Sequence, residues 1–190
     1  MPLDIHFVNV RREVEEIEAL IAPQLQAKQL RYEYAACAPE MRVCADPRSL
    51  RQILLNLLSN AIKFTAPRGR VALSCSADGD KVRIDVTDTG IGIAPDKLDT
   101  IFEPFVQLDR DSSHPKEGSG LGLSISRDFA RAMRGDLIAE SQVGRGSTFS
   151  VILPSASGPD HCEPAAISET SESSKSHGRP ERETSKSSAS

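Results

Sequence analysis

The chain has 190 residues, of which 38% are hydrophobic and 26% charged, and its formal net charge at pH 7 is −4. This length suits one globular domain with a tail better than two sizeable domains. The acidic balance, with no basic block and no basic stretch interleaved with aromatics, argues against DNA or RNA as a partner.

The cysteines and the N-terminus indicate the cellular compartment of the protein. Cys37, Cys44, Cys75 and Cys162 form no C-x-x-C pair and no Cys/His cluster with metal-ligand spacing. We therefore expect reduced thiols, with neither zinc nor a disulfide framework. The N-terminus lacks a charged segment followed by an apolar one, and no stretch approaches the roughly 20 apolar residues of a membrane-spanning helix. The sequence thus predicts a cytoplasmic chain without membrane insertion.

The first half of the sequence carries two helical patterns and one strand-like pattern. Apolar residues recur at helical spacing over residues 11–28, where Pro23 is expected to kink the helix or end its first part. Alternation over residues 30–36 predicts a strand. Asp46 followed by proline is typical of a helix start, and the wide apolar stripe after it predicts a core helix over residues 47–65.

The middle of the sequence contains a hairpin pattern followed by an irregular segment. Residues 71–77 and 81–88 alternate between apolar and polar, which predicts two strands joined by a turn at residues 78–80. After Phe105 the chain is polar, carries charges of both signs and shows little periodicity. We interpret that segment as a mobile lid.

Regular patterns return near residue 121 and end before the tail. Helical spacing over residues 121–134 is followed by a glycine that suits the position after the last turn. Residues 136–141 and 146–153 predict a second hairpin. Beyond it, Ser, Glu, Lys, Pro and Thr dominate, and one large aliphatic side chain cannot offset the entropy of ordering. We therefore predict a folded domain over residues 1–154 and a disordered, Ser-rich tail over residues 155–190.

Three polar side chains share one face of the helix predicted over residues 47–65. Asn56, Asn60 and Lys63 follow at i, i+4 and i+7. The Asn60 amide oxygen suits Mg²⁺, a hard ion that prefers oxygen ligands, and the Lys63 ammonium group can meet a phosphate as a point charge. Asn56, one turn earlier, can reach the same region. Taken alone, the three residues could equally form a polar flank on a buried helix.

A carboxylate and two glycines end the second predicted strand. Asp88 follows an apolar alternation, and Gly90 and Gly92 allow the backbone to turn tightly behind it. A carboxylate only accepts hydrogen bonds, so it favours the exocyclic amino group of adenine over the carbonyl of guanine. An ordinary turn at residues 88–90 is the alternative.

A second glycine motif precedes the helix predicted from residue 121. The backbone N–H groups of Gly118, Gly120 and Gly122 and the positive end of that helix can hold phosphate oxygens. The motif matches neither G-x-x-x-x-G-K-[ST] nor a full dinucleotide fingerprint. A lid hinge is a second interpretation, compatible with the first. Lys116 and Arg110 could reach the terminal phosphate when the lid closes, or remain solvated surface charges. Order and spacing of the motifs together predict an ATP site.

Five motif-like segments follow one another along the chain: LLNLLSNAIKFT, DTGIGI, IFEPF, GSGLGLS and GRGSTF. This order closely resembles the asparagine, glycine and phenylalanine boxes in the catalytic and ATP-binding domain of two-component sensor histidine kinases, in the GHKL superfamily. The likeness covers residues 7–153. It implies an α+β fold, a two-layer α/β sandwich whose mixed, mostly antiparallel sheet carries helices on one face, with ATP between the helices and a mobile lid.

The resemblance also implies residue roles. Asn60 would be the Mg²⁺ ligand, Asn56 and Lys63 would be the catalytic residues near the phosphates, and Thr148 would lie near the adenine-binding Asp88. The full set of implied nucleotide contacts is Asn56, Asn60, Lys63, Asp88, Gly90, Gly92, Ile93, Lys116, Gly118, Ser119, Gly120, Leu121, Gly122 and Thr148.

The implied activity is transfer of the γ-phosphoryl group of ATP to a histidine. An amide at Asn56 cannot take a proton from water as the Glu of the gyrase and chaperone branches does, so transfer is favoured over hydrolysis. The sequence shows no phosphoacceptor helical hairpin, so the histidine-containing dimerisation domain would act in trans or be lost from this chain, with a response regulator as an indirect partner. Glu117 departs from the family by placing an acid where many relatives have Gly. The alternatives are a regulatory nucleotide-binding module and an anti-sigma-type serine kinase.

Overall fold

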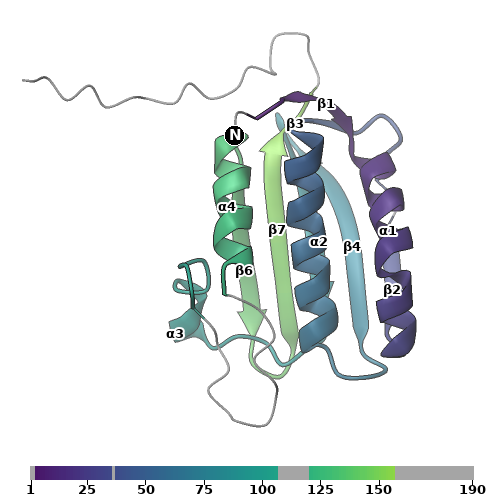
Figure 1. Ribbon diagram of the computed structural model, residues 1–190, viewed down its shortest axis with the longest axis vertical. Helices are drawn as coiled ribbons and strands as arrows, with labels where there is room; N and C mark the ends of the chain where they lie inside the picture. The colour runs from purple at the N-terminus through teal and green to yellow at the C-terminus, as the bar shows by residue number, and fades with distance from the viewer. Residues whose placement is uncertain (1–2, 36, 107–119, 157–190) are drawn as a thin grey trace, which may run out of the picture.

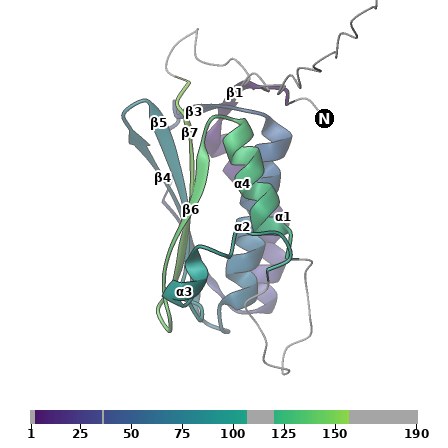
Figure 2. The ribbon, with the colours of Figure 1, turned by 90° about the vertical axis from the view of Figure 1, so that its left-hand side faces the viewer.

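Three long helices lie on one face of a five-stranded sheet in the computed structural model, which describes residues 3–35, 37–106 and 120–156 (Figures 1 and 2). The long helices are α1 (Val10–Ala27), α2 (Pro47–Phe64) and α4 (Gly122–Ala132). A single helical turn, α3 (Pro95–Leu98), lies beside the lower end of the sheet in Figure 1. The other face of the sheet carries no helix among the described residues (Figure 2).

The main sheet is mixed and mostly antiparallel. Its strand order is β2-β4-β5-β7-β6, in which β2 and β4 pair in parallel and the other neighbours are antiparallel. The strands are β2 (Arg31–Ala35), β4 (Arg70–Asp78), β5 (Lys81–Asp88), β6 (Asp136–Gln142) and β7 (Gly146–Pro154). A separate antiparallel pair consists of β1 (His6–Asn9) and β3 (Arg42–Ala45). The predicted two-layer α+β fold is therefore confirmed.

Helix α2 begins and ends with specific caps. The Ser49 amide donates to the Asp46 carboxylate (2.9 Å), so Asp46 is the N-cap that the sequence predicted, and proline follows in the first turn. At the other end, the Lys28 ammonium group donates to the carbonyls of Ile62 and Lys63, each at 2.7 Å. These bonds satisfy carbonyls that have no partner within the helix. The helix that carries the three predicted polar residues is thus held at both ends.

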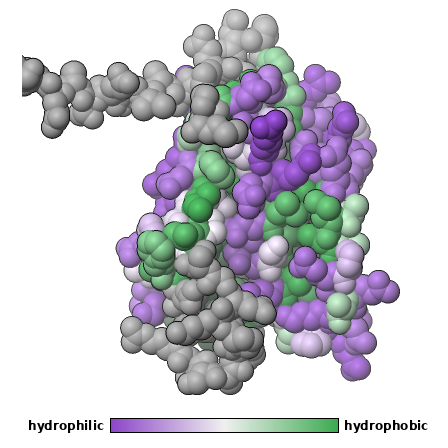
Figure 3. Space-filling model, in the orientation of Figure 1, coloured by the Kyte–Doolittle hydropathy of each residue, from purple (hydrophilic) through white to green (hydrophobic). Residues whose placement is uncertain are grey.

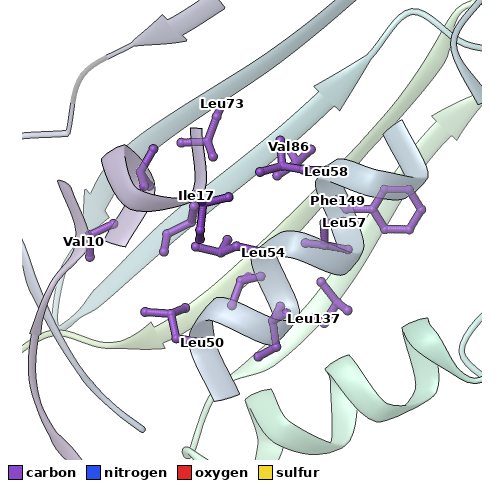
Figure 4. Close-up of a cluster of buried hydrophobic side chains, with 14 of the residues drawn as sticks. Val10, Ile17, Leu50, Leu54, Leu57, Leu58, Leu73, Val86, Leu137 and Phe149 are labelled. Atoms are coloured by element: carbon purple, nitrogen blue, oxygen red, sulfur yellow. The ribbon is translucent and has the colours of Figure 1, made fainter. Parts of the chain in front are cut away.

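The core lies between α2 and the sheet (Figure 4). The apolar stripe of α2 is fully or nearly fully buried, and strands β4 and β5 contribute alternate side chains from the face that it covers. Burial of each large aliphatic side chain contributes about 1.5–3 kcal/mol, so this layer is the main source of stability. The labelled core residues are Val10, Ile17, Leu50, Leu54, Leu57, Leu58, Leu73, Val86, Leu137 and Phe149.

Two helix details differ from the sequence expectation. Helix α1 continues past Pro23 to Ala27, so Pro23 does not end its first part. Proline leaves the carbonyl of Ala19 without an amide partner, but both residues are exposed, so water can replace that bond. After α4 the left-handed residue is Arg134 (φ 61°) rather than Gly135. Gly135 is needed for another reason, because a Cβ there would lie 2.0 Å from the Ile152 carbonyl oxygen.

The expectation of reduced cysteines is wrong for every cysteine in the described part of the chain, because Cys37, Cys44 and Cys75 are all disulfide-bonded. Cys37 and Cys75 form a disulfide, with their Cα atoms 5.1 Å apart. Cys37 follows β2 and Cys75 lies in β4, and the parallel pairing that matches Ala35 with Ser74 brings them together. Their separation of 38 residues hides this proximity in the sequence.

The helix-bearing surface is mostly hydrophilic, with an apolar patch over α1 and α2 (Figure 3). Leu20 of α1 is 56% exposed, and Leu55 of α2 is partly buried. Within the described ranges no helix combines the length and apolar character needed to cross a membrane. Most of the lid predicted after Phe105 and of the tail predicted over residues 155–190 lies outside the described residues and stays a prediction. Ser155 and Ala156, at the start of that tail, are described, and their amides donate to the carbonyls of Asp80 (2.7 Å) and Arg42 (2.9 Å).

Candidate functional site

Helix α2 presents the three predicted polar residues beside its buried stripe. Asn56 and Asn60 are half-buried, and Lys63 is exposed at the last turn. The Asn56 Nδ2 atom donates to the Ser126 hydroxyl on α4 (3.0 Å). Among the described residues, none makes a hydrogen bond to the Asn60 side chain. Asn60 therefore keeps an amide oxygen available for a ligand.

Asp88 ends β5 as a buried carboxylate, 5% exposed. It accepts hydrogen bonds from the amide of Gly90 (2.7 Å) and from the amide of Ser147. Burial raises the pKa of Asp88 above its usual value, and the two backbone N–H groups oppose that shift. No Lys or Arg in the described part of the chain forms an ion pair with it. A buried carboxylate without a cation is costly to fold, which indicates a binding role.

The backbone around Asp88 is too close-packed for side chains at two glycines. Gly92 has a φ of 69°, and a Cβ there would lie 2.1 Å from the Gln142 carbonyl oxygen. Gly146 has a φ of 106°, and a Cβ there would lie 1.9 Å from the Asp88 carbonyl oxygen. Both positions therefore need glycine on conformational and steric grounds. The β6–β7 turn thus packs directly on the segment that follows Asp88.

The structure places Thr148 on the face of the sheet opposite to Asp88. Thr148 pairs with Thr87, and their hydroxyl oxygens are 3.1 Å apart. Side chains alternate along a strand, so Ser147, the strand partner of Asp88, shares its face. The expectation for Thr148 is thus off by one residue. Only the β5–β7 register could identify Ser147.

Ser147 belongs to a small hydroxyl network behind the carboxylate. Its hydroxyl oxygen is 2.9 Å from that of Ser141, which also accepts from the amide of Ile93 (2.8 Å) and donates to the carbonyl of Gly146 (2.9 Å). Ile93 is itself 8% exposed and packs against the core. These bonds hold the first glycine motif against the β6–β7 hairpin, a role for Ser141 that sequence reasoning missed.

The N-terminus of α4 lies against the Asn56 face of α2. Gly122 is the first residue of α4, and a Cβ there would lie 2.3 Å from Asn56 Oδ1. Leu121 holds the N-cap position, and its apolar side chain makes no capping hydrogen bond. Gly120 precedes it with a φ of 70°, and its carbonyl accepts from the Phe105 amide (3.0 Å). A helix start beside an amide, at an N-cap residue whose own side chain cannot cap it, is a suitable place for a phosphate.

Two contacts join the first glycine motif and the start of α4 to the C-terminal half of α2. The Ile91 amide donates to the carbonyl of Phe64, the last residue of α2 (3.3 Å). The Asn56–Ser126 bond joins α2 to α4 further along the helix. The structure therefore brings together the predicted residues Asn56, Asn60, Lys63, Asp88, Gly90, Gly92, Ile93, Gly120, Leu121 and Gly122. Lys116, Gly118 and Ser119 lie outside the described residues.

The aromatic residues of the IFEPF segment flank this site. The Arg127 guanidinium group lies over the ring of Phe102, 4.5 Å from its centre. Phe105, by contrast, is 75% exposed and has a φ of 65°. Phe102 is thus fixed against α4, whereas Phe105 faces solvent.

Residues 45–157 match the family described as Histidine kinase-, DNA gyrase B-, and HSP90-like ATPase. This match covers more than half of the chain, and the geometry above places the family's motifs around one site. The chain belongs to this family and is a catalytic and ATP-binding domain of the sensor histidine kinase type.

The chain is similar in sequence to part of several longer sensor kinases. The aerobic respiration control sensor protein ArcB of Escherichia coli (strain K12) is 40% identical over 154 residues, 80% of this chain and 20% of ArcB. The circadian input-output histidine kinase CikA of Synechococcus elongatus is 46% identical over 110 residues, 58% of this chain and 15% of CikA. The chain thus spans a fifth or less of the length of these two relatives.

Solved structures share the fold. Full-length ShkA in complex with AMPPNP superposes with a TM-score of 0.71 at 36% identity, covering 82% of this chain and 32% of ShkA. The catalytic domain of histidine kinase ThkA gives a TM-score of 0.71 at 25% identity, covering 80% of this chain and 96% of that domain. ThkA has also been solved in complex with the response regulator protein TrrA.

Proposed function

We propose that this domain binds Mg·ATP and positions it for transfer of the γ-phosphoryl group to a histidine on a separate dimerisation domain or chain. The observation that carries the proposal is the convergence of three features on α2: the buried carboxylate of Asp88, the amides of Asn56 and Asn60, and the N-terminus of α4. The AMPPNP complex of ShkA supports a nucleotide in this fold. A cytoplasmic location, where ATP is available, is part of the proposal.

Adenine recognition would rest on Asp88. Its carboxylate is held in place by two backbone N–H groups and keeps further lone pairs to accept the exocyclic amino group of adenine. A guanine carbonyl at the same place would face another acceptor, and the unmade hydrogen bonds would disfavour it. The pocket floor is the close-packed backbone at Gly90 and Gly92.

The residues present fit a magnesium ion that arrives with the nucleotide. In the described part of the chain, no group of three or more His, Cys, Asp or Glu side chains could hold a metal by itself. Asn60 offers a neutral oxygen ligand without a hydrogen-bond partner in the described residues, which complements an ion already neutralised by phosphate oxygens. When bound, Mg²⁺ would neutralise phosphate charge during in-line transfer.

The chain's own groups would position the phosphates and leave water unactivated. Lys63 and the N-terminus of α4 supply positive charge to phosphate oxygens. Asn56 is an amide whose Nδ2 is already bonded to Ser126, and an amide cannot act as a general base. Hydrolysis is therefore disfavoured, and the acceptor histidine comes from another domain. Onward passage to a response regulator is supported by the complex of ThkA with TrrA.

A label-transfer assay tests this function. Purified chain is mixed with γ-labelled ATP and a separate histidine-containing helical-hairpin domain, and acid-labile label on that domain is expected. Asn60→Asp should abolish transfer, because a carboxylate adds negative charge beside the phosphates. Gln52→Glu places the same charge on an exposed position of α2 and should transfer normally. Nucleotide binding without transfer to any hairpin would favour a regulatory module. Acid-stable phosphoserine on a partner protein would favour a serine kinase.

A further inference from the structure

Ser126 of α4 is a buried serine whose hydroxyl meets Asn56 of α2. Its oxygen lies 3.0 Å from Asn56 Nδ2, the donor in this bond. Ser126 is 1% exposed, so no water can easily replace the contact. The two residues are separated by 70 positions in the sequence and joined by the packing of α2 on α4. The bond therefore links the two helices that border the proposed phosphate region.

The bond matters because a side-chain amide has two chemically different ends. With Nδ2 directed at Ser126, the Oδ1 atom of Asn56 lies against Gly122, the first residue of α4. A helix N-terminus presents amide hydrogens and partial positive charge, which favour an acceptor atom there. A flipped amide would put its donor end against that positive terminus. A serine hydroxyl can either donate or accept, so the start of α4 selects this orientation and the bond to Ser126 then holds the amide in it.

We propose that Ser126 is a positioning residue for Asn56. Its bond restrains the Asn56 amide in the orientation that the start of α4 selects, and it does not itself touch the nucleotide. This role rests on the proposed function, since it assigns to Ser126 the orientation of a group next to the reacting phosphate. Without the hydroxyl, the amide can rotate about its last torsion and lose its alignment for transfer, while the adenine contacts at Asp88 stay in place.

The variant Ser126→Ala tests the role, with Ser124→Ala as the matched control. Ser124 is also buried in α4, but its hydroxyl donates to the carbonyl of Leu121 in its own chain segment (2.9 Å). We expect Ser126→Ala to lower kcat for transfer by about three- to tenfold, the worth of one hydrogen bond, with KM for ATP little changed. Ser124→Ala should leave kcat nearly unchanged, and a single cooperative urea transition in each variant would show that both fold.

A second measurement does not depend on activity. In a ¹⁵N-labelled protein the two side-chain amide hydrogens of Asn56 should shift in Ser126→Ala and stay in place in Ser124→Ala. Unchanged Asn56 signals, or a wild-type kcat in Ser126→Ala, would overturn the positioning role. A wild-type protein that transfers no label, with Asn56 signals that still respond to Ser126→Ala, would refute the proposed function while the hydrogen bond stands.

Discussion

Replacing Asp88 by Asn should weaken nucleotide binding without weakening the fold. The carboxylate is 5% exposed and already accepts hydrogen bonds from the amides of Gly90 and Ser147. An Asn side chain has one acceptor oxygen, so it cannot both accept from these amides and accept from adenine through separate oxygens. If its oxygen keeps the backbone bonds, its NH₂ group meets the adenine amino group, and two donors face each other.

The magnitude follows from the loss of a hydrogen bond to a charged acceptor. Such a bond contributes about 1.5–3 kcal/mol, and a factor of ten in Kd corresponds to about 1.4 kcal/mol. The Kd for Mg·ATP should therefore rise by about one to two orders of magnitude. The same substitution should raise the free energy of unfolding, or leave it unchanged. Because burial raises the pKa of Asp88 in the folded state, its ionisation at neutral pH costs stability, and Asn removes that charge.

Calorimetric titration with Mg·ATP and thermal unfolding without nucleotide measure the two effects. Asp85→Asn is the matched control, since Asp85 is on the same strand but on the opposite face, paired with Arg83 at 2.8 Å. We expect this control to bind like the wild type. A Kd for Asp88→Asn within threefold of wild type would refute the adenine role, and a large fall in its melting temperature would refute the reasoning on stability.

Three further outcomes are expected. Gly122→Ala introduces a Cβ 2.3 Å from Asn56 Oδ1, so the unfolding free energy in urea should fall by about 1–3 kcal/mol and Mg·ATP should bind more weakly. Wild-type values for both quantities would contradict the close approach of α4 to Asn56. Asp46→Ala removes the N-cap that accepts from the Ser49 amide and should cost about 0.5–2 kcal/mol in the same measurement, without effect on Kd once folded. As pH falls, protonation of Asp88 should begin above the usual range of an Asp because burial raises its pKa, so affinity should decline on acidification, and the Asp88→Asn variant should lack this part of the pH dependence.

Much of the fold could be predicted because its signals are local. The proline after Asp46 and the apolar stripe that follows mark α2 correctly, since a helix is specified by caps and by a period of 3.6 residues. The β4–β5 hairpin could also be predicted from the sequence, because Gly79 (φ 60°) lies in a turn between two strands with alternating apolar residues. The order of the glycine motifs also identified the family, although it said nothing about which side chains face one another.

Tertiary structure decided the features that depend on distant parts of the chain. Strand β3 is short and was not predicted, because it is defined by pairing with β1. The choice of Ser147 over Thr148 depends on the β5–β7 register, since a shift of one residue reverses the face of every side chain. The disulfide of Cys37 with Cys75 and the bond of Asn56 to Ser126 likewise join residues that only packing brings together. Local sequence determines whether a segment forms a helix or a strand. The partner of a buried polar group depends instead on how the helices pack on the sheet, which only the folded chain as a whole determines.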